Sequence, residues 1–246
     1  MQGWSFTIFR LFGIRLSVHY SFFLLPLLVV WNPIAERDWS TALYALLFLL
    51  AAYVCVVLHE LGHCFVALRW GIRVPRILLM PIGGMAEFDH MPREPKKEIG
   101  IALAGPTVNL IIVAILILCI GWPDDWDSSA LYEGMTGFWV EIAIANFGMA
   151  VFNLIPVFPM DGGRVLRSLL SIRMTYLKAT FWAALIAKIL ALCLIGLALW
   201  QHWWMAAVLF SFIIVVGDAE YRSVRRSEEE AERYRLLYRE IPESGT

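Results

Sequence analysis

Charged side chains are scarce in this chain of 246 residues. Asp, Glu, Lys and Arg together make up 17% of it, where a soluble domain has about 25%, while hydrophobic residues reach 60%. A water-soluble fold of this size cannot bury so many apolar side chains and still cover its surface with polar groups. The composition therefore excludes a soluble enzyme, a disordered protein and a collagen-like fibre, and it leaves a polytopic membrane protein.

Cysteine is also rare, and neither sign of charge is in excess. The four cysteines lie in apolar stretches without the Cys-x-x-Cys spacing of a thiolate metal site, so we expect small buried thiols. The formal net charge is −1, which indicates no overall affinity for nucleic acid.

Six apolar runs reach or approach the length of about 20 residues that a helix needs to cross a bilayer. They are residues 16–31, 41–70, 99–122, 135–155, 179–200 and 203–217. The short connection between the last two predicts a tight antiparallel pair. The sequence thus predicts an all-α integral membrane protein with six transmembrane helices in residues 1–217. A charged cytoplasmic tail, expected to be helical, follows in residues 218–246.

The segment between the second and third runs cannot continue a helix. It contains Val74-Pro75, Pro81 and the pair Gly83-Gly84, all of which break helices. The apolar pieces at 77–80 and 85–88 are expected to be short strands. We therefore predict a short β-like hairpin between the second and third transmembrane helices.

Lys and Arg are distributed unevenly over the loops. If the six runs cross the membrane, 18 of the 20 basic residues fall on one side. Arg37 lies on the other side, and Lys188 lies inside a run. Because basic loops stay on the cytoplasmic side, we predict that both termini are cytoplasmic. The expected location is a prokaryotic cell membrane.

The strongest chemical signal is His59-Glu60-Leu61-Gly62-His63, near the end of the second run. Residues four apart share one face of a helix, so both imidazoles can bind one metal ion, and Glu60 can reach the attacking water. Zinc favours histidine ligands and keeps a coordination position open in catalytic sites. Ionisable groups are costly in an apolar helix, which argues against a chance match. The motif therefore predicts a zinc site.

A catalytic zinc ion needs a third protein ligand near membrane depth. The candidates are His19, Glu141, His202 and Asp161. Asp161 fits best, because it follows the fourth run where that helix returns to the side on which the second run ends. Irregular backbone around Asp161 can present a carboxylate to a cavity. The alternative is an ordinary turn, since Pro-x-Asp-Gly is also common turn chemistry.

Two long motifs together closely resemble the site-2 protease family of intramembrane zinc metalloproteases. One is HELGH at 59–63, and the other, at 153–164, reads Asn-Leu-Ile-Pro-Val-Phe-Pro-Met-Asp-Gly-Gly-Arg. Residues 105–109, Gly-Pro-Thr-Val-Asn, resemble the GPxxN element of that family, and residues 81–84, Pro-Ile-Gly-Gly, resemble its glycine-containing loop. No segment is large enough for a PDZ domain, and the tail is too short for CBS modules, so we expect a compact form.

The resemblance implies a role for each matching residue. His59, His63 and Asp161 would bind one zinc ion per chain, and Glu60 would be the general base. Asn153, eight residues before the aspartate, would help to hold the substrate backbone or the oxyanion. We expect Asn109 and Asn146, in contrast, to make only interhelical hydrogen bonds.

The implied activity is that of a zinc endopeptidase, which hydrolyses a peptide bond within or beside a transmembrane segment of a partner protein. The released fragment would enter the cytoplasm. A helical substrate must unwind first, because its carbonyl groups are hydrogen-bonded. Gly83 and Gly84 would offer the extended substrate a strand edge. The expected partners are the substrate and the lipid bilayer, and also a regulatory membrane protein or a second copy of the chain, but no nucleic acid.

Two other classes of protein remain open. A metal transporter would use the histidines as an ion site, and it would need polar groups along a continuous path to the outer face. A scaffold that binds transmembrane helices would have no need of Glu60 between the two histidines.

Overall fold

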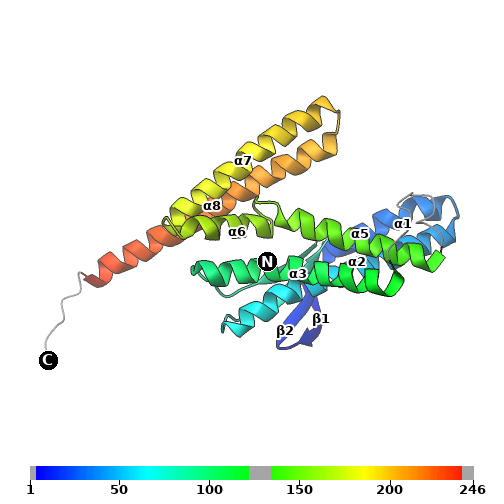
Figure 1. Cartoon of the computed structure of the whole chain (residues 1–246), viewed down its shortest axis with the longest axis horizontal. Coiled ribbons are helices and arrows are strands. Elements are labelled where there is room, and N and C mark those ends of the chain that lie inside the picture. Colours follow the sequence, from blue (N-terminus) through cyan, green and yellow to red (C-terminus); the bar gives the residue numbers. More distant parts are fainter. Residues whose placement is uncertain (1–3, 82, 122–133, 240–246) are drawn as a thin grey trace. The chain divides into compact units, whose positions relative to one another are not determined.

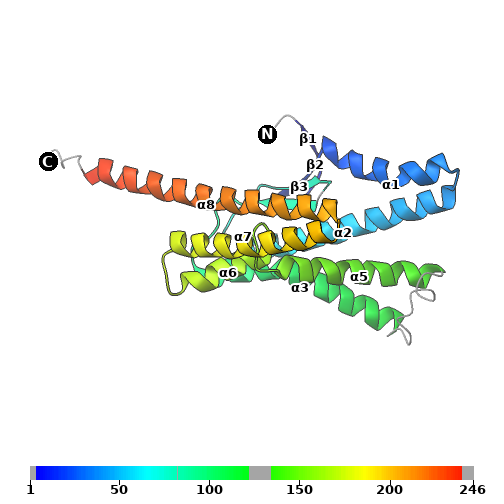
Figure 2. The same cartoon turned by 90° about the horizontal axis from the view of Figure 1, so that it is seen from above.

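The computed structural model describes residues 4–81, 83–121 and 134–239 (Figures 1 and 2). The chain forms two compact units, residues 1–92 with 100–153 and residues 93–99 with 154–246. The first unit contains a four-stranded sheet, α1 (Leu24–Ala35), α2 (Trp39–Arg69) and most of α3 (Pro95–Ile120) and α5 (Gly134–Leu154). The second unit contains α6 (Asp161–Ser171), α7 (Tyr176–Trp200) and α8 (Trp204–Arg239).

Five helices among the described residues are long and apolar enough to cross a membrane. They are α2, α3, α5, α7 and α8. The 31 residues of α2 extend over about 46 Å, well beyond the roughly 30 Å of a hydrocarbon core. The 12 residues of α1 reach only about 18 Å. The predicted membrane fold is confirmed, with five helices of spanning length and one shorter apolar helix where a sixth crossing was expected.

The sheet has the order β1-β2-β3-β4. Its strands are β1 (Ser5–Leu11), β2 (Ile14–His19), β3 (Arg76–Met80) and β4 (Gly83–Glu87). β1 pairs antiparallel with β2, β2 pairs parallel with β3, and β3 pairs antiparallel with β4. The hairpin expected after the second run is therefore present, and it is part of a larger sheet.

The first apolar run begins as a strand, which the hydropathy of the sequence did not indicate. Ile14, Leu16 and Val18 of β2 are buried in one core with Cys64 and Ala67 of α2. These side chains are covered by protein and do not need lipid. A short apolar run cannot be assigned to a helix or a strand from hydropathy alone, because both bury it equally well.

The β3–β4 hairpin is held at both of its ends. Arg76 and Glu87 lie opposite each other, and the guanidinium donates two hydrogen bonds of 2.7 Å to the carboxylate. The same guanidinium lowers the pKa of Glu87 below its ordinary value. At the other end, the Tyr53 hydroxyl of α2 lies 3.2 Å from the carbonyl oxygen of Met80 and 3.1 Å from that of Pro81. The hairpin is thereby fastened to α2, and this fixes where β4 lies along the helix.

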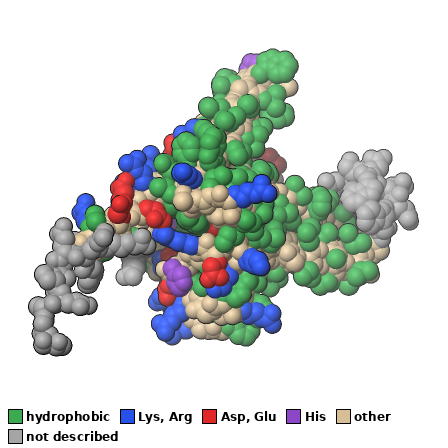
Figure 3. All heavy atoms as spheres, turned by 60° about the vertical axis from the view of Figure 1, so that its left-hand side comes forward, with side chains coloured by type: hydrophobic (Ala, Val, Ile, Leu, Met, Phe, Trp, Pro, Cys, Tyr) green, Lys and Arg blue, Asp and Glu red, His purple; other side chains and the backbone are tan. Residues whose placement is uncertain are grey.

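In the second unit, α7 and α8 form an antiparallel pair (Figures 1 and 2). Small residues of α7, such as Ala183 and Ala187, are buried, and small residues allow helices to approach closely in a membrane. Hydrophobic side chains make up most of the side-chain surface of this hairpin that Figure 3 shows, and a histidine lies at its tip. α8 continues past residue 217 without interruption, so residues 218–239 are helical. The domain boundary at 217 stays a prediction, and residues 240–246 lie outside the described residues.

α6 is anchored within the second unit by Arg167, whose side chain is only 2% exposed. Its guanidinium bonds the carboxylates of Glu98 and Glu220, the latter at 2.6 Å, and lies over the rings of Phe158 and Tyr176. Burying a guanidinium is favourable only when its charge and donors are matched, and here two carboxylates match them. The segment that leads into α6 is therefore packed against a fixed cation.

Candidate metal centre

The two histidines of the HExxH motif lie one turn apart on α2, and each is 4% exposed. Their Nε2 atoms lie 3.1 Å apart. Two nitrogen ligands on one tetrahedral zinc ion, with bonds of about 2.0–2.1 Å, would be about 3.3 Å apart. The spacing of His59 and His63 therefore fits a shared zinc ion.

The proton positions on His59 follow from a chain of hydrogen bonds that ends at a backbone carbonyl. The amide nitrogen of Asn146 donates to the carbonyl oxygen of Ile142 at 2.8 Å, so the amide oxygen of Asn146 must be an acceptor. It accepts from the amide nitrogen of Asn109 at 2.8 Å, which leaves the amide oxygen of Asn109 for His59 Nδ1, 2.5 Å away. His59 therefore carries its proton on Nδ1.

His63 is oriented in the same way by a different acceptor. Its Nδ1 lies 2.7 Å from the carbonyl oxygen of Ile101 on α3, and a carbonyl can only accept. With both protons on Nδ1, the two Nε2 lone pairs face each other, an arrangement that a cation between them stabilises. Metal-binding histidines usually donate their second N–H to such a partner, and the partner fixes the tautomer. The donor set thus fits the metal that the sequence predicts.

Gly105 lets α3 pass directly against the two imidazoles. A Cβ atom at this position would lie 2.3 Å from His63 Nε2 and 2.6 Å from His59 Nε2. No side chain fits at those distances, so the position requires glycine for space rather than for backbone conformation. The first residue of the GPxxN element therefore keeps clear the volume in front of the two Nε2 atoms.

Glu60 points toward the sheet. Its Oε2 atom accepts a hydrogen bond of 3.0 Å from the main-chain N–H of Ala86 in β4. A Cβ atom on Gly84 would lie 2.8 Å from Glu60 Cγ and 3.1 Å from Val56 Cγ1, so glycine permits the strand to lie this close to α2. Gly83, with φ of +133°, starts the strand in a conformation that side chains disfavour. The structure therefore brings the predicted base beside the predicted strand edge.

Asp161 belongs to the second unit, where it is the first residue of α6 and 7% exposed. A Cβ atom on Gly162 would lie 2.3 Å from the carbonyl oxygens of Leu154 and Ile155. The main chain at the end of α5 therefore packs directly against the first turn of α6. A carboxylate oxygen is one of the ligand types that zinc accepts beside histidine nitrogen. The role of Asp161 as third ligand is taken up below as a proposal.

Asn153 donates a hydrogen bond of 3.1 Å to the carbonyl oxygen of Met149 within α5, so its substrate role stays a prediction. Among the other third-ligand candidates, His19 accepts from the N–H of Ser21 and caps the short helix Tyr20–Phe23. His202 lies in the turn after α7 with φ of +60°.

Asn109 is the site residue whose role the sequence did not indicate. The expected interhelical bond between Asn109 and Asn146 is present, and the same amide also holds His59. An asparagine in an apolar helix predicts only that it has a polar partner. Asn109 lies four residues after Gly105 and so shares its helix face, which meets the histidines. This spacing is the sequence signal that could have indicated a role beside the histidines.

Asn109→Ala is expected to weaken zinc binding by about 10–100-fold, the usual cost of losing an outer partner of a metal ligand. The readout is zinc affinity measured by competition with a chelator. Thr107→Ala is the matched control on α3, since Thr107 is exposed and its hydroxyl donates to the carbonyl oxygen of Leu103 on its own helix. Equal affinities in the two variants would contradict a role for Asn109.

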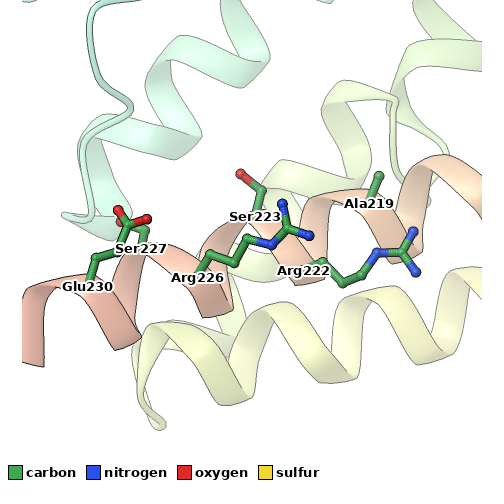
Figure 4. Close-up of a pocket in the computed structure, with 6 residues that line it drawn as sticks. All are labelled: Ala219, Arg222, Ser223, Arg226, Ser227 and Glu230. Atoms are coloured by element: carbon green, nitrogen blue, oxygen red, sulfur yellow. The ribbon is translucent and has the colours of Figure 1, made fainter. Parts of the chain in front are cut away.

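A polar hollow elsewhere in the described residues lacks these features. It lies on α8 and is lined by Ala219, Arg222, Ser223, Arg226, Ser227 and Glu230 (Figure 4). Its single carboxylate and two guanidinium groups do not form a metal donor set. The histidine pair on α2 is therefore the better candidate for chemistry.

Comparison with known proteins matches residues 47–125 and 120–197 to the model of peptidase family M50. These ranges include the HExxH motif and Asp161. The chain is 38% identical over 196 residues to zinc metalloprotease MJ0392 of Methanocaldococcus jannaschii, which covers 79% of this chain and 54% of that protein. It is 35% identical over 170 residues to putative zinc metalloprotease sll0528 of Synechocystis, covering 65% and 42%. The chain thus spans about half the length of these relatives.

A solved structure resembles the fold as well. The site-2 protease from Methanocaldococcus jannaschii superposes with a TM-score of 0.64 and 33% sequence identity. The match covers 89% of this chain and 95% of that one.

Proposed function

Because this chain belongs to peptidase family M50 and is a membrane zinc metalloprotease of the site-2 type, we propose that it cleaves a transmembrane or membrane-adjacent segment of a partner membrane protein. The observation that carries this proposal is the histidine pair. Both Nε2 atoms face one position, both Nδ1 atoms are held by acceptors, and the pair lies on an apolar helix of spanning length. A site built in this way acts at membrane depth.

His59 and His63 would hold the metal through Nε2, and Asp161 would supply the third ligand. Support for Asp161 comes from its residue type, its burial at the start of α6 and its place in the matched family segment. A bound zinc ion polarises the scissile carbonyl and lowers the pKa of the attacking water. Three protein ligands leave a coordination position open for this chemistry.

Glu60 would serve as the general base. It takes a proton from the water as the water oxygen bonds to the carbonyl carbon, and it passes that proton to the amine nitrogen as the C–N bond breaks. Asn153 would hold the substrate backbone or the oxyanion through its amide. The products are first a carboxylic acid and an amine. They become a carboxylate and an ammonium group when the acid proton moves to the amine, so atoms and charges balance with water as the only other reactant.

The substrate would bind as a strand beside β4. A helical segment has no free carbonyl group for attack, whereas a strand next to Gly83 and Gly84 is extended and exposes one. Support comes from the position of β4 at the end of the sheet order and from its contact with Glu60. The edge and the base would then act on the same peptide.

The distribution of basic residues supports an orientation for the chain. If the short α1 completes a sixth crossing, 18 of the 20 basic residues lie on one side. Both termini would then be cytoplasmic, and the cleaved fragment would enter the cytoplasm of a prokaryotic cell. Residues 1–217 would form the protease and residues 218–246 a cytoplasmic extension. The partners would be the substrate, the bilayer, and a regulatory membrane protein or a second copy of the chain.

The proposed orientation predicts the result of cysteine labelling. Single cysteines placed at Lys96 and at residue 125, in a chain without its native cysteines, should react with a thiol reagent from opposite sides of the membrane. Labelling of both from the same side would contradict the six-helix topology.

Asp161→Ala is expected to weaken zinc binding and abolish cleavage, because it removes the only carboxylate of the proposed ligand set. Asp161→Asn separates a ligand from a turn residue, since an amide can hold the same turn but is a poor zinc ligand. Zinc per chain and hydrolysis of the reconstituted protein are the readouts. Asp89→Asn, at an exposed aspartate, is the control expected to keep both. Normal zinc content and activity in Asp161→Asn would remove Asp161 from the site.

A further inference from the structure

The main-chain groups of β4 alternate between the sheet and its outer edge. β4 is the last strand in the sheet order, so its far edge has no strand partner among the described strands. Ala86 directs its N–H away from β3, because that N–H donates to Glu60 Oε2 at 3.0 Å. Residues two apart on an antiparallel strand point the same way, so Gly84 also turns its N–H and C=O outward. The outer edge therefore presents Gly84 and Ala86.

Glu60 occupies one of the positions that a strand on this edge would use. Gly84 leaves room for the side chain of Glu60, since a Cβ atom there would lie 2.8 Å from Glu60 Cγ. The carboxylate then reaches the N–H of Ala86, and the N–H of Gly84 lies one pairing position further along. An incoming strand can bond the outward groups of Gly84, but it meets the Glu60 carboxylate at Ala86.

We propose that the main-chain N–H of Ala86 is a positioning group that holds the Glu60 carboxylate by one oxygen and leaves the other oxygen for the attacking water. This rests on the proposed function, in which Glu60 is the general base. A half-buried glutamate has three rotatable side-chain bonds, and a bond to a fixed amide selects one orientation among them. The sheet itself therefore orients the base.

The same contact sets the register of the substrate. The substrate strand can pair with Gly84, but it cannot pair with the N–H of Ala86, because that N–H already donates to the Glu60 carboxylate. The scissile peptide bond then lies next to Ala86, beside the Glu60 carboxylate that acts as its general base. A substrate shifted by two residues would place a different peptide bond at this point, so the strand edge chooses the bond that is cut.

The first test needs no substrate. Amide hydrogen exchange of Ala86 is measured by NMR in protein labelled with 15N-alanine and held in detergent micelles. Glu60→Ala removes the acceptor, and the Ala86 amide is expected to exchange about tenfold faster, the equivalent of one hydrogen bond. Glu60→Gln keeps an acceptor oxygen and should keep most of the protection. Unchanged exchange in Glu60→Ala would overturn the proposal.

The second test removes the donor. Proline is tolerated on an edge strand where the N–H faces outward, so Ala86→Pro should leave the hairpin folded. Hydrolysis of fluorescein-labelled casein, an unfolded probe, is expected to lose at least tenfold in kcat, with zinc per chain unchanged. Lactic acid at position 86 removes the same N–H without the constraint of the proline ring, and it should give the same loss.

Two comparisons separate positioning from a loosened sheet. In the Glu60→Gln background, Ala86→Pro should cause no further loss, because the group acts through Glu60. Arg76→Gln weakens the hairpin through its ion pair with Glu87 and keeps the N–H of Ala86. A loss in Arg76→Gln equal to that in Ala86→Pro would overturn the proposal in favour of simple loosening.

The failure of the proposed function would look different. No casein hydrolysis by the wild-type protein, with the Ala86 amide still protected by Glu60, would overturn the protease function and with it the role of the contact. The positioning role alone would be overturned if the wild type hydrolyses casein but the Ala86 amide exchanges at the same rate in the wild type and in Glu60→Ala.

Discussion

Glu60→Gln is expected to lower the turnover of peptide hydrolysis by at least about 100-fold, to a slow residual rate, while zinc binding stays at the wild-type level. Glutamine has the size of glutamate and keeps an oxygen that can accept from the N–H of Ala86, but it cannot take a proton from water. A general base contributes about 10²–10⁴-fold, which sets the minimum loss of turnover. The measurement is hydrolysis of labelled casein by reconstituted protein, with zinc per chain determined on the same sample.

Glu94→Gln is the matched control for this prediction. Glu94 is an exposed glutamate that bonds Lys97 at 2.6 Å, three residues along the chain, and such surface pairs contribute little. Its variant is expected to hydrolyse the probe at the wild-type rate. Wild-type turnover by Glu60→Gln would contradict the mechanism and would reopen the transporter and scaffold interpretations.

Gly105→Ala is expected to remove bound zinc. The added Cβ atom would lie 2.3 Å from His63 Nε2 and 2.6 Å from His59 Nε2, so either α3 or the imidazoles must move. The methyl group then occupies the space in which the two nitrogen ligands converge. The loss of zinc affinity should exceed the roughly 10–100-fold expected from losing an outer partner such as Asn109. Chelator competition on the purified protein measures it.

Gly148→Ala tests whether a glycine-to-alanine change in an apolar helix is harmful in itself. Gly148 lies on α5, and a Cβ atom there would meet nothing within 4 Å. Alanine is a better helix former by about 1 kcal/mol, so this variant should keep its zinc and be at least as stable. Retention of zinc by Gly105→Ala at wild-type affinity would show that α3 can shift without disturbing the histidines.

The ligand pair could be predicted because its geometry is local. Two residues four apart on a helix share a face whatever surrounds that helix, so the motif alone placed His59 and His63 together. Asp161 was reached by a different argument, from the direction of the fourth apolar run and from the family resemblance. The partners of the histidines could not be reached in either way, because Ile101 and Asn109 lie about 40–50 residues further along the chain.

The first apolar run shows that hydropathy alone does not distinguish a membrane helix from a buried strand. Residues 16–31 are apolar enough for a helix, yet Leu16 and Val18 belong to a strand that packs on α2. A side chain leaves water equally well in protein and in lipid, so its hydrophobicity does not report which of the two covers it. The pairing of β2 with β3, about 60 residues away, decides the matter.

By itself the sequence determined the membrane class, the apolar helices, the hairpin after α2 and the zinc-binding residue types, because these depend on composition and on local periodicity. The tertiary structure decided which atoms face which. It turned the Nε2 atoms of His59 and His63 toward each other, cleared their space at Gly105, and set Glu60 against Ala86. Such contacts join residues far apart in the chain, and their existence depends on how α2, α3 and the sheet pack, which no local pattern encodes.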